Sequence, residues 1–306
     1  MKLKSYVAGA WVEGEGQGKV VVDAVRGEPV CEVTSAGIDM AEVMRYARDV
    51  GGTALRSMTF HERALALKTT AKHLMEMKED FYQLSFKTGT TRADAWPDIE
   101  GGIGTVFSYA SLVTREFPND VVMIEGDVER LSRNGTFIGR HILTPKVGVA
   151  VHINAYNFPV WGMLEKIAPS IAAGMPVVVK PATQTAYLTQ AVVAEIIKCG
   201  ALPKGAIQLI CGSTGNLLDL LNEQDVVTFT GSAETGQTLK NHPNILSNSI
   251  PFNMEADSLN CAILGQSVGP DDEEFSIFIK EVAREMTSKA GQKCTAIRRV
   301  IVPEES

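Results

Sequence analysis

The chain has 306 residues, of which 45% are hydrophobic and 21% are charged, so it can bury a substantial core in roughly two domains. Its formal net charge of −7 and its isoelectric point of about 5.4 argue against nucleic acid or an anionic membrane surface as the main partner. No apolar run in the sequence approaches the ~20 residues that a membrane-spanning helix requires.

The amino-terminal part of the sequence predicts two helices. Apolar residues recur at helical spacing over 40–50, and the pair Gly51-Gly52 is expected to end that helix. The segment Thr59–Glu62 has the pattern of a capping box, which predicts the beginning of a second helix that runs toward Gly89.

A β-hairpin is predicted next, because apolar and polar residues alternate over 129–144 around Asn134-Gly135. That dipeptide is the strongest short-range signal for a hairpin turn. The hairpin separates a helical part of the sequence from a part in which strands and helices alternate.

From Val147 onward, short apolar runs alternate with helical segments. Continuous apolar runs separated by helices indicate parallel strands that are covered on both faces, so the fold class is expected to be α/β. The predicted strands are 147–153, 176–180, 206–211 and 226–230, and the predicted helices lie near 160–173, 185–199 and 215–222.

The segment after Glu255 predicts a strand at 261–264, a helix over about 271–289 and a final strand at 299–302. A terminal strand with no following element has few partners in the sequence. We therefore expect this segment to be the beginning of a domain that the sequence does not complete.

The five cysteines are scattered, without C-x-x-C spacing or nearby histidine pairs, so we predict no disulfide framework, no metal site and a reduced, cytoplasmic compartment. Cys294 differs from the others because it lies in a small polar turn after an amphipathic helix. Adjacent Lys293 and a nearby helix start would favour its thiolate. An inert cysteine is the alternative. We expect that alternative for Cys31, Cys199, Cys211 and Cys261.

Three polar residues follow predicted strands, where parallel sheets bind ligands. Glu255 is a candidate general base if burial raises its pKa, and otherwise a surface carboxylate. Asn157 is a candidate side-chain donor to an oxyanion, and otherwise a turn residue. Lys180 is a candidate contact for a ribose or phosphate, and otherwise a solvated loop lysine.

The segment Thr230–Gly236 follows a predicted strand and begins a helix. Glycines at Gly231 and Gly236 permit a tight turn, and the first amides of the helix could bind a phosphate near Ser232. The spacing is not the G-x-G-x-x-G of ordinary dinucleotide folds, so a strand-to-helix turn without a ligand is the other interpretation.

Taken together and in this order, the motifs resemble the aldehyde dehydrogenase superfamily from about Val7 to the last residue. The motifs that carry the resemblance are Asn157-Phe-Pro159, Lys180-Pro-Ala182, Phe229-Thr-Gly-Ser232, Glu255 and Gly291-Gln-Lys-Cys-Thr-Ala296. The segments 152–159, 254–260 and 289–299 are most similar to the branch that oxidises semialdehydes in the degradation of phenylacetate and benzoyl-CoA.

The resemblance implies a role for each candidate residue. Cys294 would be the nucleophile, Glu255 would activate the deacylating water, and Asn157 would bind the oxyanion together with the backbone amide of Cys294. Lys180 would hold the adenosine ribose of a nicotinamide nucleotide or its 2′-phosphate. The other residues expected to contact this nucleotide are Thr183, Gly231, Ser232, Gly236 and Ala256.

The resemblance also implies the domain organisation. Residues 1–127 and 145–255 would form a cofactor-binding domain around a Rossmann-type parallel sheet with helices on both faces. Residues 128–144 would form an oligomerisation hairpin, and 256–306 the beginning of a catalytic domain. The superfamily's later Glu-x-Phe-Gly-Pro segment is not in this sequence. We therefore expect a truncated member that forms a homo-oligomer when complete.

Two positions depart from the common pattern of the superfamily. The segment Glu255–Ser258 reads Glu-Ala-Asp-Ser where Glu-Leu-Gly-Gly is frequent, so the loop beside the nicotinamide should have a different shape. Thr183 stands where NAD-preferring members often carry glutamate. A threonine does not repel a 2′-phosphate, so we expect NADP as the cofactor, with NAD as the other possibility.

The expected reaction is oxidation of a small-molecule aldehyde, in particular a CoA-linked semialdehyde, to its carboxylic acid through a thiohemiacetal and a thioester on Cys294. Two alternatives stay open. One is a CoA-acylating dehydrogenase, in which CoA instead of water takes the acyl group; the presence of Glu255 tells against it. The other is a nucleotide-binding module without catalytic activity.

Overall fold

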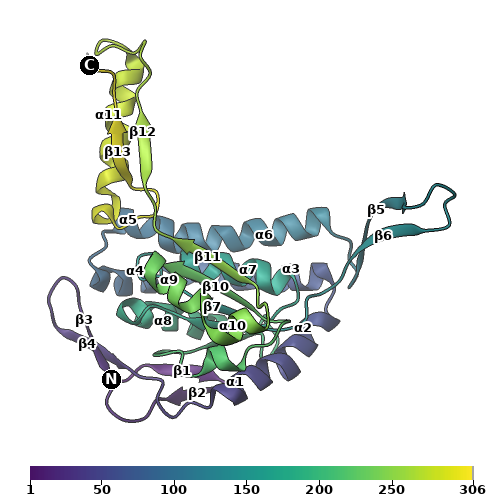
Figure 1. The fold of residues 1–306 in the computed structure, drawn as a ribbon. Coiled ribbons are helices and arrows are strands. Elements are labelled where there is room, and N and C mark those ends of the chain that lie inside the picture. The colour runs from purple at the N-terminus through teal and green to yellow at the C-terminus, as the bar shows by residue number, and fades with distance from the viewer. Residues whose placement is uncertain (305–306) are drawn as a thin grey trace.

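The computed structural model describes residues 1–304 and is built around one mixed sheet of seven strands (Figure 1). The strand order is β11-β10-β7-β8-β9-β1-β2, in which the first five strands are parallel and the last two are antiparallel to their neighbours. The strands are β1 (Lys4–Val7), β2 (Ala10–Glu13), β7 (Ala150–Ile153), β8 (Val177–Lys180), β9 (Ile207–Leu209), β10 (Val226–Gly231) and β11 (Phe252–Ala256).

The predicted parallel sheet is confirmed. Strands β7 and β9 are buried along their whole length, as expected for apolar strands that are covered on both faces. The register pairs Ile153 with Lys180 and Thr230 with Glu255, so the carboxyl ends of these four strands lie at one edge of the sheet. The prediction missed β1 and β2, because runs of four residues are too short to show a period.

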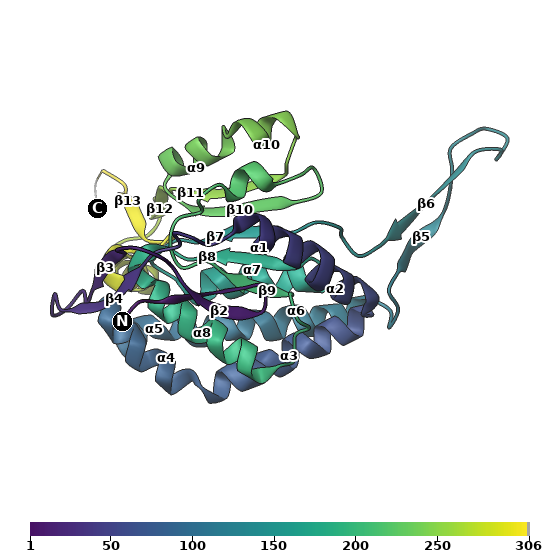
Figure 2. The same cartoon turned by 90° about the horizontal axis from the view of Figure 1, so that it is seen from below.

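One face of the sheet is covered by two layers of helices (Figure 2). The helices α7 and α8 connect the central strands, and α3 and α6 pack on α7. The capping box is confirmed: Glu62 N donates to Thr59 Oγ1 at 3.1 Å, and Thr59 N donates to Glu62 Oε2 at 2.7 Å. The helices on this side are α3 (Phe60–Glu76), α4 (Lys78–Ser85), α5 (Arg92–Trp96), α6 (Gly102–Glu116), α7 (Trp161–Ala172) and α8 (Ala186–Cys199), with the short turns η2 (Phe86–Thr88), η3 (Pro97–Gly101) and η4 (Thr183–Thr185).

The other face of the sheet packs against shorter elements. Alternate strand residues point to opposite faces, so Val178 lies in this second core while Val177 and Val179 lie in the first. The helix predicted near 215–222 is only a 3₁₀ turn. The elements on this face are α1 (Met40–Tyr46), η5 (Leu217–Leu220) and α10 (Pro243–Ser247), and α9 (Ala233–Lys240) packs on β10 and β11.

The prediction that Gly51-Gly52 ends the first helix is wrong. The helical backbone continues through η1 (Ala47–Gly52) into α2 (Thr53–Ser57). A Cβ atom added to Gly51 would lie 2.0 Å from the carbonyl oxygen of Gly205. Glycine is therefore needed here because two backbones approach closely, and not because the helix ends.

The predicted hairpin is confirmed and projects from the body of the molecule (Figures 1 and 2). Its antiparallel strands are β5 (Met123–Arg130) and β6 (Ile138–Leu143), and Asn134-Gly135 lies in the loop between them. The hairpin begins earlier than predicted, since Met123 already pairs with Leu143. A second, smaller antiparallel pair near the amino terminus consists of β3 (Lys19–Val22) and β4 (Pro29–Val33).

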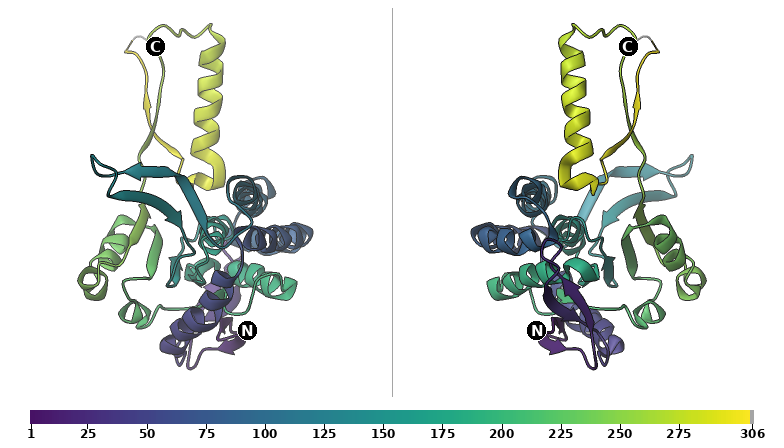
Figure 3. Two further views of the ribbon diagram at one scale, coloured as in Figure 1. Left: turned by 90° about the vertical axis from the view of Figure 1, so that its right-hand side faces the viewer. Right: turned by 90° about the vertical axis from the view of Figure 1, so that its left-hand side faces the viewer.

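The carboxy-terminal segment stands away from the sheet (Figures 1 and 3). It contains the parallel strands β12 (Asn260–Ile263) and β13 (Ile297–Ile301), the helix α11 (Glu273–Thr287) and the turn η6 (Ser288–Gly291). The predicted strand, helix and strand are therefore confirmed. Within residues 1–304, none of the helices is long and apolar enough to cross a membrane.

Candidate active site

Two cavities meet at the carboxyl edge of the sheet. The first, which we call the Trp161 cavity, has a volume of about 530 Å³ and is lined by α7 and the loop before it, by η3, and by the Cys294 turn. The second, the Ser232 groove, has a volume of about 820 Å³ and runs along the ends of β7, β8 and β10. Both are lined by Ala155, Asn157, Thr230, Glu255, Lys293 and Cys294.

The turn that carries Cys294 is shaped by three consecutive residues in the left-handed region, Lys289, Ala290 and Gly291, with φ values of 51°, 53° and 75°. They reverse the chain after α11. The carbonyl oxygen of Cys294 then accepts hydrogen bonds from Asn260 Nδ2, at 2.6 Å, and from Ser258 Oγ. These bonds fix the backbone of the turn while the cysteine side chain stays exposed.

Two features were expected to favour the Cys294 thiolate: a nearby helix start and the charge of adjacent Lys293. The structure differs from both expectations. The residues after Cys294 enter the strand β13 and do not begin a helix. Lys293 Nζ is bound to both carboxylate oxygens of Glu285, at 2.9 and 2.7 Å, so its charge is already compensated. The hydrogen bond from Lys293 in turn lowers the pKa of Glu285.

The other cysteines differ in their surroundings. Cys31 and Cys211 are buried, and burial raises the pKa of Cys31 and raises that of Cys211 to about 12, as expected for unreactive thiols. Cys199 is half-buried, and Cys261 is exposed on β12. Neither Cys199 nor Cys261 lines either cavity.

Glu255 and Asn157 reach the same place from different strands. Glu255 lies on β11, where Thr230 Oγ1 donates to its Oε2 at 3.3 Å, and its side chain is exposed. Asn157 Nδ2 donates to the carbonyl oxygen of Gln292 at 3.2 Å. That bond uses one of the two amide hydrogens and joins the loop after β7 to the Cys294 turn.

Behind this loop lies a buried carboxylate that the sequence analysis missed. Asp98 Oδ1 accepts hydrogen bonds from Val160 N at 3.0 Å and Trp161 N at 2.8 Å, at the beginning of α7. Lys289 Nζ lies 4.7 Å from the centroid of the Phe158 ring, and Lys289 N donates to Asp94 Oδ1 at 3.0 Å. These contacts tie the Asn-Phe-Pro loop to the turn that carries the cysteine.

We expect Asp98 to make stability depend on pH. Burial raises the pKa of Asp98 from 3.8 to about 6, although Lys289 and the two α7 amides oppose the shift. A raised pKa in the folded state favours the protonated form. The contribution is therefore fully present below about pH 4 and is lost as the pH rises through 6. A shift of this size corresponds to about 3 kcal/mol.

The Asp98→Asn variant should remove that dependence. Thermal unfolding of both proteins from pH 4 to 8 should show the parent losing stability relative to the variant as the pH rises through 6. Taking the difference cancels the titration of all other carboxylates. A difference that is constant over this range would contradict the assignment.

The Ser232 groove contains most of the residues predicted for the nucleotide. Lys180, Thr183, Gly231, Ser232 and Ala256 all line it. Burial lowers the pKa of Lys180, with nearby Cys211 acting in the opposite direction.

Two backbone amides at the beginning of α9 already donate hydrogen bonds to side chains of the protein. Ser232 Oγ caps the helix by accepting from Thr235 N at 3.3 Å. Asp257 Oδ1 accepts from Ala233 N at 3.2 Å. A phosphate that binds the first amide of α9 would therefore replace the Asp257 carboxylate.

Gly236 does not line the groove, contrary to the prediction. It is buried between α9 and the sheet, where an added Cβ would lie 2.6 Å from Met254 Cε and 3.0 Å from Phe229 Cε1. The glycine allows α9 to pack closely on the strands, which is a structural role. Sequence spacing alone does not separate this role from contact with a phosphate.

A nicotinamide nucleotide fits the residues of the groove. The volume of about 820 Å³ is typical of small-molecule sites, and Lys180 supplies a cation at the end of β8. The groove also contains Asn154, which is only 5% exposed and whose two amide atoms have no hydrogen-bond partner among the described residues. Unused polar groups of this kind are expected in a site that receives a polar ligand.

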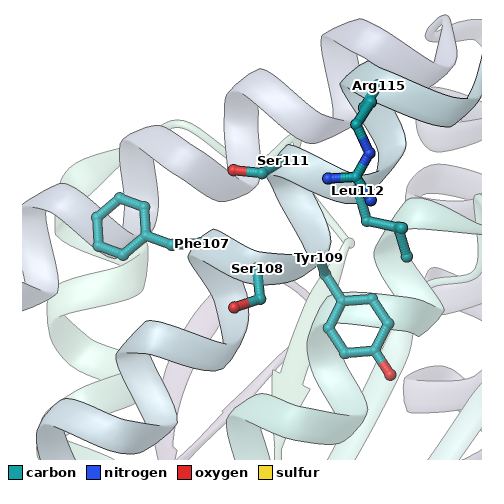
Figure 4. Close-up of a pocket in the computed structure, with 6 residues that line it drawn as sticks. All are labelled: Phe107, Ser108, Tyr109, Ser111, Leu112 and Arg115. Carbon is teal, nitrogen blue, oxygen red and sulfur yellow. The ribbon is translucent and has the colours of Figure 1, made fainter.

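A third hollow, of about 590 Å³, lies on the outer side of α6 (Figure 4). All its lining residues belong to that helix, and Arg115 is their single charged side chain. It offers no nucleophile beside a base, so we place the chemistry at the other two cavities. Among residues 1–304, no cluster of three or more His, Cys, Asp or Glu side chains is arranged to hold a metal ion.

A mixed, mainly parallel sheet covered by helices, with a groove along the carboxyl ends of its parallel strands, defines the class of α/β proteins that bind small molecules at that edge. The sequence identifies the particular family. The model of the aldehyde dehydrogenase family matches residues 11–306, and the chain belongs to that family.

Among curated relatives, the chain is 46% identical over 304 residues to a 3,4-dehydroadipyl-CoA semialdehyde dehydrogenase from Aromatoleum evansii, covering 99% of this chain and 59% of the relative. A glutarate-semialdehyde dehydrogenase from Pseudomonas aeruginosa is 31% identical over 245 residues, covering 78% of this chain and 48% of that protein. The chain thus spans less than two thirds of these relatives.

Solved structures show the same fold. The chain matches a betaine aldehyde dehydrogenase from Staphylococcus aureus in complex with NAD⁺ with a TM-score of 0.83 and 23% identity, covering 100% of this chain and 58% of that structure. An NADP-dependent glyceraldehyde-3-phosphate dehydrogenase from Bacillus halodurans, complexed with NADP, has a TM-score of 0.78 and 24% identity, covering 100% and 62%. The predicted fold class is confirmed.

Proposed function

We propose that the full-length protein oxidises a semialdehyde to the carboxylic acid, with NADP as the oxidant. The observation that carries the proposal is that Cys294, Glu255 and Asn157 line both cavities at the place where they meet. A substrate in the Trp161 cavity and a nucleotide in the Ser232 groove would come together at these three residues.

The roles follow from the chemistry of the side chains. The Cys294 thiolate attacks the aldehyde carbon, and the resulting oxyanion accepts hydrogen bonds from Asn157 Nδ2 and from the backbone amide of Cys294. The nicotinamide ring supplies the acceptor for the hydride when the nucleotide is bound. Glu255 takes a proton from the water that cleaves the Cys294 thioester. The sum is aldehyde, NADP⁺ and water giving acid, NADPH and a proton.

Lys180, Thr183, Gly231, Ser232 and Ala256 would hold the nucleotide. Lys180 at the end of β8 supplies a charge-assisted contact to a 2′-phosphate, and Thr183 supplies a hydroxyl without a negative charge. These two side chains favour NADP over NAD.

The Thr183→Glu variant tests this preference. A carboxylate in the turn η4, just before α8, would repel the 2′-phosphate, so we expect NADP affinity to fall by about tenfold or more while NAD affinity changes less. Fluorescence titration with the reduced forms, NADPH and NADH, gives both dissociation constants. The Gln184→Glu variant places the same charge one residue further along the groove and should change the ratio less. Equal affinities of the parent for the two nucleotides would show that Thr183 is not the discriminator.

A CoA-linked semialdehyde is our preferred substrate, because a relative with 46% identity carries such a substrate in its name. The second candidate function, a CoA-acylating dehydrogenase, forms acyl-CoA instead of free acid. Incubation of the full-length protein with semialdehyde and NADP, with and without CoA, separates the two by mass spectrometry of the product. Formation of the free acid without CoA is the expected result. Nucleotide binding with no product would instead support a non-catalytic module.

The domain organisation is part of the proposal. Residues 1–127 and 145–255 would form the cofactor-binding domain, and 256–306 the first part of the catalytic domain. The hairpin at 128–144 would join subunits of a homo-oligomer, because its projecting strands expose apolar side chains. The exposed apolar side chains within 128–144 are Val128, Leu131, Phe137, Ile138, Ile142 and Leu143. The scattered free cysteines support a cytoplasmic location.

A further inference from the structure

The wall of the Trp161 cavity is mainly apolar. Aromatic rings from Trp96, Phe158 and Trp161 line it, and Glu165 is the charged residue that α7 contributes. Trp161 and Glu165 are four residues apart on α7, so both point from the same face of the helix into the cavity. The Glu165 side chain is 36% exposed.

An ion pair with Lys166 orients the Glu165 side chain, which still lines the cavity. Lys166 Nζ lies 3.2 Å from Glu165 Oε1 and also donates to the carbonyl oxygen of Gly162 at 2.9 Å. The Lys166 side chain is only 11% exposed and does not line the cavity. The ion pair therefore orients the carboxylate, while Lys166 offers no contact to a molecule inside.

The lysine that lines the cavity is already paired. Lys293 lines it, and its ammonium group binds Glu285 at 2.7 and 2.9 Å. Lys166 pairs with Glu165, and Glu255 adds a further carboxylate from β11. Lys289 Nζ lies over the Phe158 ring, but Lys289 is not among the lining residues. Within the part of the chain that the structure describes, two carboxylates, Glu165 and Glu255, therefore line the cavity together with one cation, Lys293, which is bound to Glu285.

We propose that Glu165 makes this cavity reject aldehydes whose far end is a free carboxylate and accept the same chain when that carboxylate is masked as an ester or thioester. The inference rests on the proposed function, because it takes the Trp161 cavity as the place of the aldehyde. A carboxylate entering this space would lose water among aromatic rings and lie beside like charge. A thioester has no charge at that position, and the phosphates of CoA lie at the far end of its long arm.

The test compares adipic semialdehyde with its methyl ester in the full-length protein. We expect the parent to favour the ester in kcat/KM by about tenfold or more, the size expected from one partly solvated contact between like charges. Glu165→Gln should bring the ratio close to one by lowering KM for the acid. Glu165→Arg should favour the acid. Glu223→Gln, which removes an exposed carboxylate outside the cavity, should keep the ratio of the parent.

A second measurement needs no turnover. Each aldehyde is used to protect Cys294 from alkylation by iodoacetamide, and the modified peptide is quantified by mass spectrometry. The ester should protect the parent at lower concentration than the acid, and Glu165→Gln should remove that difference. Equal protection by both aldehydes in the parent, or an unchanged difference in Glu165→Gln, would overturn the assignment. Failure to form reduced nucleotide with either aldehyde would count against the proposed oxidation, and the protection experiment would still decide the role of Glu165.

Discussion

The Cys294→Ala variant should lose aldehyde oxidation almost completely and keep its affinity for the nucleotide. Cys294 is the one cysteine that lines the two cavities, and its exposed side chain lies where they meet. Removal of a covalent nucleophile costs on the order of 10⁴- to 10⁶-fold in comparable enzymes. Alanine also leaves the carbonyl oxygen in place, so the bond from Asn260 that shapes the turn can still form.

Two measurements on the full-length protein check this result. Steady-state assays give the loss of activity, and fluorescence titration with NADPH gives the affinity for the nucleotide. Cys199→Ala is the matched control, because Cys199 ends α8 and lines neither cavity. It should keep the activity of the parent. Activity of Cys294→Ala within tenfold of the parent would exclude Cys294 as the nucleophile.

The central strands could be predicted because strands that are buried on both faces consist almost entirely of apolar residues. Val177, Val178 and Val179 are apolar without alternation, since each face of β8 meets a separate core. The pair Gly51-Gly52 was misinterpreted for the opposite reason. What requires glycine there is the carbonyl group of Gly205, which is far away in the sequence and leaves no local pattern.

In the candidate site, too, local patterns could be predicted from the sequence, and contacts that depend on the folded chain could not. The end of β8 and the beginning of α9 put Lys180 and Ser232 at one groove, and strand-end position alone predicts this. The state of Lys293 could not be predicted, because its partner Glu285 lies two turns earlier on α11 and becomes its neighbour only after the left-handed turn at 289–291. Asp98 was missed because its partners are backbone amides, which every sequence contains.

The Glu255→Gln variant should separate the two halves of the reaction. The amide keeps the size of the side chain and can still accept the hydrogen bond from Thr230 Oγ1, but it cannot take a proton from water. Attack by Cys294 and loss of the hydride do not require that proton. Deacylation does, and we expect it to slow by about 10²- to 10⁴-fold, the usual contribution of a general base.

Rapid mixing of the full-length variant with aldehyde and NADP should then give a burst of reduced nucleotide close to one equivalent per site, followed by slow turnover. Mass spectrometry during the slow phase should find the acyl group on Cys294. Thr230→Val is the matched comparison, because it removes the hydrogen bond to Glu255 and keeps the carboxylate, so its turnover should fall much less. If Glu255→Gln slows the burst and the steady state equally, Glu255 acts before the thioester forms, and the deacylating base is another group.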